Sequence, residues 1–263
     1  MRGTVKQGTG GGRTCSKSVG PRVIFALAAL GVGCAPAMPP PESTPRQRFE
    51  WSTERFDDGK YSQAIRGFRD HLFRDPLDST ADSTRLLLAE SYLQSDQELL
   101  AANEFRQLAT TRPNSALADD AQFGVCRAYW KLSPDIARDQ EFTRNTIDEC
   151  TRLVEFYPRS PLATDARAIM AEATEKLAAK ELRVGRWYFS RNLYQSSIIY
   201  LESVLESYPG SGVEPEVLAL LYEAYSYVGF SREAEQVRER LLQVYPDSPE
   251  AGELPLQAEA GDR

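Results

Sequence analysis

Prolines close a series of segments that share one pattern of apolar and polar positions along this chain. Three of them stand in the motif Tyr-Pro-x-Ser, which begins at Tyr157, Tyr208 and Tyr245, and degenerate copies contain Pro76 and Pro113. The five prolines are 37, 45, 51 and 37 residues apart. Proline ends one helix, and the serine that follows can cap the next. The pattern therefore predicts a succession of helical hairpins.

Counting each unit so that its terminal proline is position 32 brings the same residue types to the same positions. The first unit has Gly59 at position 15, Tyr61 at 17, Ala64 at 20 and Phe68 at 24. Tetratricopeptide repeats, whose period is 34 residues, place a turn glycine, an aromatic, an alanine and a large apolar residue in this way. Residues of the same phase recur in three other units: Ala89, Tyr92, Ala101 and Phe105; Gly185, Tyr188, Tyr194 and Leu201; Tyr225, Gly229 and Ala234.

This agreement predicts an all-α, right-handed solenoid of about five tetratricopeptide repeats, with units one and two over residues 46–114 and units three to five over 115–250. A lone amphipathic hairpin, the alternative, would not repeat its pattern at one phase. The third unit fits worst, because its hairpin loop near Ser133 to Gln140 carries about ten extra residues. Ser160 and Ser248, each followed by proline, are predicted to cap helices whose first residue is that proline.

The start of the chain has the pattern of a targeting segment. Basic residues without acids precede an apolar run, Val23 to Val32, that is too short for the ~20 residues of a membrane span but suits a signal-peptide core. The run ends in Leu30-Gly31-Val32-Gly33-Cys34, which resembles a bacterial lipobox. We therefore expect residues 1–33 to be a lipoprotein signal peptide and Cys34 to carry lipid. An ordinary secretory signal is the alternative.

Four prolines between residues 34 and 45 predict a semi-rigid spacer between the lipid and the repeats. Pro45 either begins the first helix or ends this spacer. Two or three acyl chains on Cys34 would make a stable anchor. Residues 251–263 lack periodicity and are expected to form a flexible tail.

The charge of the chain disfavours nucleic acid as a partner. The 31 basic and 38 acidic residues give a net charge of −7. Residues 1–33 hold five of the basic residues and none of the acidic ones, so 26 basic residues face 38 acidic ones in the rest, a net charge of −12. An acidic domain of this kind repels a phosphate backbone.

Candidate catalytic chemistry is absent from the sequence. His71 is the only histidine, on the inner face of a predicted helix, and is expected to be structural. The cysteines and histidine do not have the spacing of a zinc site, and neither a phosphate-binding loop nor a nucleophile elbow is present. We therefore expect no cofactor and no enzymatic activity.

Two cysteines, Cys126 and Cys150, lie on the two predicted helices of the third unit. Cys150 falls at position 24, a core position. The heights of the two residues along antiparallel helices differ by about 7 Å at 1.5 Å per residue. This offset makes a free pair the favoured interpretation and a disulfide the less favoured one, although an exported protein would meet an oxidising compartment.

The first helix of each repeat lines the concave face of such solenoids, where an extended peptide can bind. Repeat phase predicts the residues of this groove: Phe49, Thr53, Phe56, Glu90, Leu93, Val125 and Tyr129. Three aromatic residues, Trp187, Tyr188 and Phe189, are predicted at the end of a long helix, and core packing is the simplest account of them.

One segment also resembles a known family. Arg138-Asp139, then Tyr157-Pro158-Arg159-Ser160, Asp165-Ala166 and Leu177-Ala178-Ala179-Lys180-Glu181 are similar to the BamD (YfiO/ComL) family of tetratricopeptide lipoproteins of the β-barrel assembly machinery. Asp58 to Ile65 looks like the first hairpin turn of that family. The likeness covers essentially the whole chain after the signal peptide.

The resemblance implies a non-enzymatic scaffold on the periplasmic face of the outer membrane, held there by its acyl anchor. Its partners would be a BamA-like barrel protein with POTRA domains, other lipoproteins of the machinery, and unfolded outer membrane proteins. The resemblance assigns the C-terminal signal of these substrates to residues 46–114 and the barrel partner to residues 115–250. Tyr200 stands where relatives carry an arginine facing the barrel protein, and Arg191 is a second expected interface residue.

Two other functions remain open at the level of the sequence. A general tetratricopeptide lipoprotein could coordinate Tol or peptidoglycan machinery, although no heptad run precedes Phe49 as in many such proteins. A solute-binding or enzymatic accessory domain would need a closed pocket of titratable groups, and the single histidine argues against it.

Overall fold

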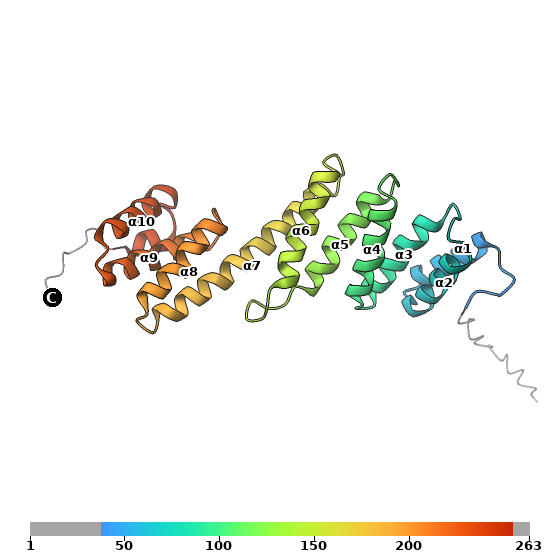
Figure 1. Ribbon diagram of the computed structural model, residues 1–263, viewed down its shortest axis with the longest axis horizontal. Coiled ribbons are helices and arrows are strands. Elements are labelled where there is room, and N and C mark those ends of the chain that lie inside the picture. Colours follow the sequence, from blue (N-terminus) through green and yellow to red (C-terminus); the bar gives the residue numbers. More distant parts are fainter. Residues whose placement is uncertain (1–37, 255–263) are drawn as a thin grey trace, which may run out of the picture. The chain divides into compact units, whose positions relative to one another are not determined.

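A computed structural model describes residues 38–254, which form helices and turns without strands. Ten helices follow one another as antiparallel neighbours, each packed on the next in chain order, and an eleventh packs on α9 (Figure 1). The helices pair as α1/α2, α3/α4, α5/α6, α7/α8 and α9/α10, which confirms the predicted solenoid of five tetratricopeptide repeats. Their bounds are α1 Pro45–Asp57, α2 Tyr61–Arg74, α3 Ala81–Gln94, α4 Glu98–Thr111, α5 Ala118–Leu132, α6 Glu141–Phe156, α7 Ala163–Phe189, α8 Tyr194–Ser207, α9 Glu214–Val228, α10 Ser231–Val244 and α11 Pro249–Glu253.

Residues with positive φ form the hairpin turns of four pairs. Gly59 and Gly229 have φ of 71° and 87° at the α1–α2 and α9–α10 turns. Asp96 and Asn192 occupy the equivalent positions of the second and fourth pairs, with φ of 57° and 60°. Short polar side chains tolerate this conformation better than other non-glycine residues. The turn is therefore kept even where the glycine of the repeat pattern is missing.

The serines of the proline motifs act in two different ways. Ser248 caps α11 as predicted, accepting a hydrogen bond from the Ala251 amide, with Pro249 as the first helical residue. The prediction for Ser160 is wrong, because α7 begins only at Ala163 and Pro161 lies before it. Ser160 Oγ instead accepts from the Leu162 amide at 3.2 Å, and two successive turns connect α6 to α7.

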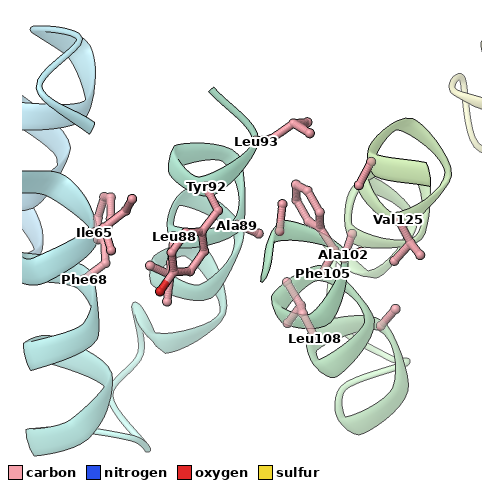
Figure 2. Packing of buried hydrophobic residues seen from close by; sticks show 14 of the residues in the cluster. Ile65, Phe68, Leu88, Ala89, Tyr92, Leu93, Ala102, Phe105, Leu108 and Val125 are labelled. Carbon is pink, nitrogen blue, oxygen red and sulfur yellow. The ribbon is translucent and has the colours of Figure 1, made fainter. Parts of the chain in front are cut away.

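The core is continuous from helix to helix. One cluster of buried side chains joins α2 to α5, and Figure 2 shows Ile65 and Phe68 of α2, Leu88 and Tyr92 of α3, and Phe105 of α4 within it. A second cluster joins α7 to α10. A third, smaller cluster with Cys126, Cys150, Leu153 and Ala166 joins α5, α6 and α7. Burial of apolar side chains between successive helices is how a repeat array without a central core is stabilised.

A disulfide joins Cys126 and Cys150, so the prediction of a free pair is wrong. Their Cα atoms are 5.1 Å apart, within the usual range for a disulfide. Cys126 lies six residues before the end of α5 and Cys150 nine residues after the start of α6. The connection over residues 133–140 lets α6 begin beyond the end of α5, and this removes the offset that a short hairpin turn would produce.

The same connection explains the length of α7, which has 27 residues. Lys176 Nζ donates to Ser133 Oγ at 2.9 Å, and Lys180 Nζ donates to the Arg138 carbonyl at 2.9 Å. The buried Gln140 side chain closes the loop from within by donating to the Asp135 carbonyl at 2.9 Å. The additional turns of α7 therefore support the long loop of the third pair.

Part of the predicted spacer belongs to the folded unit. Pro45 begins α1, and Thr44 and Gln47 form a reciprocal capping box. Pro39 is buried, and Ser43 Oγ donates to the Pro40 carbonyl at 2.6 Å. Arg48 also binds the Ser43 carbonyl and pairs with Asp75. Residues 38–44 therefore pack on the first repeat, while Cys34 and the signal peptide lie outside the described residues.

The C-terminal boundary also differs from the prediction, because α11 continues to Glu253 and Ala251 is buried against Leu218 and Leu241. The remainder of the predicted tail, from residue 255, lies outside the described part. Within residues 38–254, none of the helices is both long and apolar enough to cross a membrane.

Candidate protein-binding surfaces

A pocket of about 380 Å³ lies between the first helices of the second and third repeats, α3 and α5. It is lined by Leu93, Gln94, Arg127, Trp130 and Lys131. Trp130 supplies most of the apolar surface, with the buried Leu93 beneath it, and Arg127 and Lys131 supply two cations that neighbouring carboxylates balance. The arrangement suits an extended segment that carries both an apolar side chain and a carboxylate.

The two cations of this pocket are held by carboxylates of the neighbouring repeat. Arg127 Nη1 pairs with Glu90 Oε1 at 2.9 Å, and Lys131 Nζ pairs with Asp96 Oδ1 at 2.6 Å and with Glu98 Oε1 at 3.2 Å. The hydrogen bond to Asp96 raises the pKa of Lys131, which keeps its ammonium group charged. The Glu90 and Asp96 pairs are at least partly exposed, so an incoming carboxylate can replace these two side chains at modest cost.

Of the residues that repeat phase predicts for the groove, Leu93 of α3 lines this pocket, and Glu90 pairs with Arg127 beside it. Val125 is fully buried and contributes to the core, so it is not available to a bound segment. The surface that α5 presents to the pocket is formed by Arg127, Trp130 and Lys131. The extra residues of the loop lie between α5 and Pro158, which defines the repeat phase. Each residue of error in the loop length rotates the predicted face of α5 by about 100°.

Tyr129 lies on another side of α5, where it faces α4 and α6. Arg106 Nη2 donates to Tyr129 OH at 3.0 Å and to Glu149 Oε1 at 2.7 Å. Glu149 is buried and also accepts from Gln122 Nε2 at 3.0 Å. These contacts link three successive helices. Tyr129 is therefore part of a structural network rather than of the α3–α5 pocket.

The three predicted residues of α1 are half-buried. Phe49 packs near Phe68, with ring centroids 6.5 Å apart, and Phe56 meets Tyr61 edge to face at 5.7 Å. Thr53 Oγ1 donates to the Phe49 carbonyl at 3.0 Å. All three lie on the first helix of their repeat, as expected, but do not line the α3–α5 pocket.

A second surface gathers aromatic side chains where α7 and α8 meet. We call it the aromatic surface and define it by Trp187, Tyr188 and Tyr200, which contact one another in turn. Trp187 and Tyr188 meet edge to face at 4.9 Å between ring centroids, and Tyr188 and Tyr200 stack at 5.2 Å. Trp187 remains 48% exposed. A separate stack of Tyr194 and Tyr227, at 4.4 Å, packs on the core through Tyr194.

Both predicted interface residues belong to this region. Arg191 lies over the ring of Trp187, with its guanidinium carbon 3.8 Å from the ring centroid. Tyr200 is held flat against Tyr188, with an angle of 11° between the rings. Trp187 and Tyr188, for which the sequence suggested core packing, hold these two residues in place, whereas Tyr227 of α9 stacks on Tyr194. Exposed aromatic and arginine side chains in one group are typical of protein-binding surfaces.

The only histidine has a structural environment. His71 is fully buried, and its Nε2 lies 3.1 Å from Thr80 Oγ1. Burial lowers its pKa, and the opposing effect of Asp78 and Asp75 does not overcome burial. Residues 38–254 contain no group of three histidine, cysteine, aspartate or glutamate side chains that could hold a metal ion.

Comparisons with solved structures find tetratricopeptide proteins of low identity. The TPR2AB-domain–pHSP90 complex of yeast Sti1 aligns with 79% of this chain and 80% of its own, at 13% identity and a TM-score of 0.42. PilW, a type IV pilus biogenesis factor, aligns with 79% of this chain and 96% of its own, at 16% identity and a TM-score of 0.37.

Sequence comparison gives relatives over most of the chain. A protein of Caulobacter vibrioides is 26% identical over 215 residues, covering 80% of this chain and 70% of the relative. A protein of Haemophilus influenzae is 27% identical over 227 residues, covering 79% of this chain and 84% of the relative. Both relatives are named outer membrane protein assembly factor BamD. The model of the YfiO family, described as outer membrane lipoprotein, matches residues 41–241, and the chain therefore belongs to the YfiO family.

Proposed function

We propose that this protein is a non-enzymatic scaffold for the assembly of outer membrane β-barrel proteins. The observation that carries the proposal is the family match over residues 41–241, which takes in almost all of the five helix pairs, together with relatives named as assembly factors. A lipid on Cys34 would hold the scaffold at the periplasmic face of the outer membrane, where it would work with further lipoproteins of the machinery.

The aromatic surface is the proposed binding site for a BamA-like barrel protein with POTRA domains. Its rings pack against one another, so they would lose little conformational freedom on binding. Trp187 and Arg191 belong to the residue types that contribute most to protein interfaces. This supports assigning residues 115–250 to the scaffold role.

The α3–α5 pocket is the proposed site for the C-terminal signal of an unfolded outer membrane protein. Leu93 and Trp130 would contact an apolar side chain of the signal, and Arg127 and Lys131 would meet its terminal carboxylate. The pocket straddles the boundary between the second and third repeats. This placement extends the substrate half beyond residue 114, to which the family resemblance assigned it.

Co-purification from the native host tests the proposal. The full-length protein, carrying a C-terminal tag, would be extracted in mild detergent, and the proteins that accompany it would be identified and quantified. We expect a barrel protein with several POTRA domains in stoichiometric amount. Recovery of Tol or peptidoglycan-binding proteins without a barrel protein would overturn the proposal in favour of a general envelope scaffold.

A further inference from the structure

We propose that the first repeat rests on the phospholipid surface of the membrane through a patch at the C-terminal end of α2. The α2 patch consists of Met38 and Phe73 with Arg66 and Arg69, which line one open cavity, and of Leu77, which follows Phe73 by four residues along the chain. The proposal depends on lipidation of Cys34, which is part of the proposed function, and adds to it a second contact that orients the scaffold.

The apolar residues of the α2 patch are exposed to an unusual degree. Phe73 is 87% exposed and Leu77 is 86% exposed, the highest values among the large hydrophobic residues of the described part. Phe73 lies in the last turn of α2, and Leu77 lies in the connection to α3. Neither side chain contributes to the core. Two such side chains within five residues of the chain, with the exposed Met38 on the same cavity as Phe73, form an apolar patch of the kind that marks an interaction surface.

Met38 brings the N-terminal segment to this patch. Met38 and Phe73 line the same open cavity of about 530 Å³, together with Leu72, Leu88, Arg66 and Arg69. Pro39 is buried, and Ser43 is bonded to Pro40, so the segment that leads from the N-terminus into α1 is fixed to the first repeat. The path of the chain toward Cys34 therefore starts beside the α2 patch.

The length of chain between Met38 and Cys34 limits how far the membrane can be. Met38 follows Cys34 by four positions, and an extended chain of that length spans at most about 14 Å. An acylated Cys34 lies at the lipid surface, so Met38 has to lie within that distance of it. A protein partner has no such constraint, which is why we identify the occupant of the patch as lipid.

The charges beside the patch also suit a phospholipid surface. Residues 34–263 carry a net charge of −12, which an anionic membrane would repel. Arg66 and Arg69 are exposed on α2 next to the apolar side chains, and both line the cavity. The acidic residues of the same lining, Asp70 and Glu104, are paired with Arg74 and Arg85. Arginines flanking exposed apolar residues are typical of helices that lie at a membrane surface.

Spin labelling of the acylated full-length mature protein tests this inference. A label would be attached through Leu77→Cys, which provides a single free thiol because Cys126 and Cys150 are bonded and Cys34 would carry lipid. The protein would be reconstituted in vesicles of phosphatidylethanolamine and phosphatidylglycerol. Ile199→Cys on α8, also at an exposed position, is the matched control.

We expect a severalfold higher ratio of oxygen to nickel-chelate accessibility for the label at position 77 than at position 199. Adding Phe73→Glu, which changes an exposed side chain, should lower the ratio at position 77 to that of the control. Equal ratios at positions 77 and 199 in protein whose acylation is verified by mass spectrometry would overturn the α2 patch alone. Absence of lipid on Cys34 would overturn this inference and the anchoring part of the proposed function, and leave the assembly role standing.

Discussion

Glycines inside helices set the closest approaches between neighbouring helices of the array. A Cβ atom on Gly124 of α5 would lie 2.5 Å from the ring of Phe105 on α4, and one on Gly185 of α7 would lie 2.7 Å from Leu201 on α8. A Cβ on Gly67 of α2 would clash with Ser52 of α1. Each glycine stands where two helices of the array cross, so the pairs pack closely because no side chain separates them.

Gly124→Ala should therefore destabilise the protein, even though alanine favours a helix more than glycine does. Phe105 is fully buried and cannot move aside, so we expect a loss of about 1–3 kcal/mol, as for other overpacked cores. Gly252→Ala in α11, where a Cβ would meet no atom within 4 Å, is the control and should be neutral or slightly stabilising. Urea unfolding measures both. A neutral Gly124→Ala would mean that the two helices are not in contact here.

His71 should make the stability of the first repeats depend on pH. Burial lowers its pKa below the ordinary 6.5, so below pH 6.5 the unfolded chain binds a proton that the folded chain does not. The free energy of unfolding should therefore fall as the pH falls from about 6.5 toward the lowered pKa, by up to about 1.4 kcal/mol per pH unit. Below that pKa the contribution of His71 should become constant.

Urea unfolding at a series of pH values between 7.5 and 5 measures this dependence. His71→Gln removes the titrating group and keeps a polar side chain near Thr80, so its stability should change less with pH over the same window. Parallel pH profiles for the two proteins would show that His71 does not titrate differently on folding.

At the scale of the elements, the disulfide links α5 to α6 and should stabilise this helix pair. It closes a segment with a sequence separation of 24 residues, which includes the long loop of the third pair. Reduction should lower the free energy of unfolding by about 3 kcal/mol, mainly through the greater freedom of the unfolded chain. The double variant Cys126→Ala with Cys150→Ala should lose a comparable amount and become insensitive to the reductant.

The Gly252→Ala variant keeps both cysteines and is the control. Its free energy of unfolding should still fall when the reductant is added. Quantitative thiol titration of the unfolded, unreduced protein reports directly on the bond. If both thiols of the native pair react without reductant, the disulfide and the stability loss assigned to it are contradicted.

Individual elements also show which parts of the fold can be predicted from the sequence. The hairpins of units one, two, four and five were predictable because turn residues and apolar residues keep one spacing from the terminal proline. The hairpin of the third unit was not predictable, because the extra residues of its loop shift the phase of α5. For this reason the repeat phase assigns Val125 to the groove in place of Arg127 and Trp130. The disulfide was missed for the same reason, because the height of Cys150 depends on how the loop of residues 133–140 closes.

At the scale of the whole molecule, the proposed scaffold would act through the surfaces that it presents. Trp187→Ala combined with Arg191→Ala should weaken binding of a POTRA-bearing barrel protein by about tenfold or more, because both side chains are exposed and lie against one another at the aromatic surface. The stability of the free protein should change little. Leu242→Ala, an exposed apolar position on α10 outside the aromatic surface, should leave the affinity unchanged.

Biolayer interferometry with the purified periplasmic region of the barrel protein would give these affinities. Equal losses for the double variant and for Leu242→Ala would indicate a general effect of removing exposed side chains. Unchanged binding by the double variant would move the interface away from the aromatic surface.

Depletion of this protein in its own host tests the assembly role most directly. Folded and unfolded outer membrane β-barrel proteins differ in mobility on gels of unheated samples, so the folded fraction can be followed as the protein is lost. Our account predicts that the folded fraction of newly made barrel proteins falls while periplasmic proteins of other folds are unaffected. An unchanged folded fraction in cells from which the protein has disappeared would contradict it.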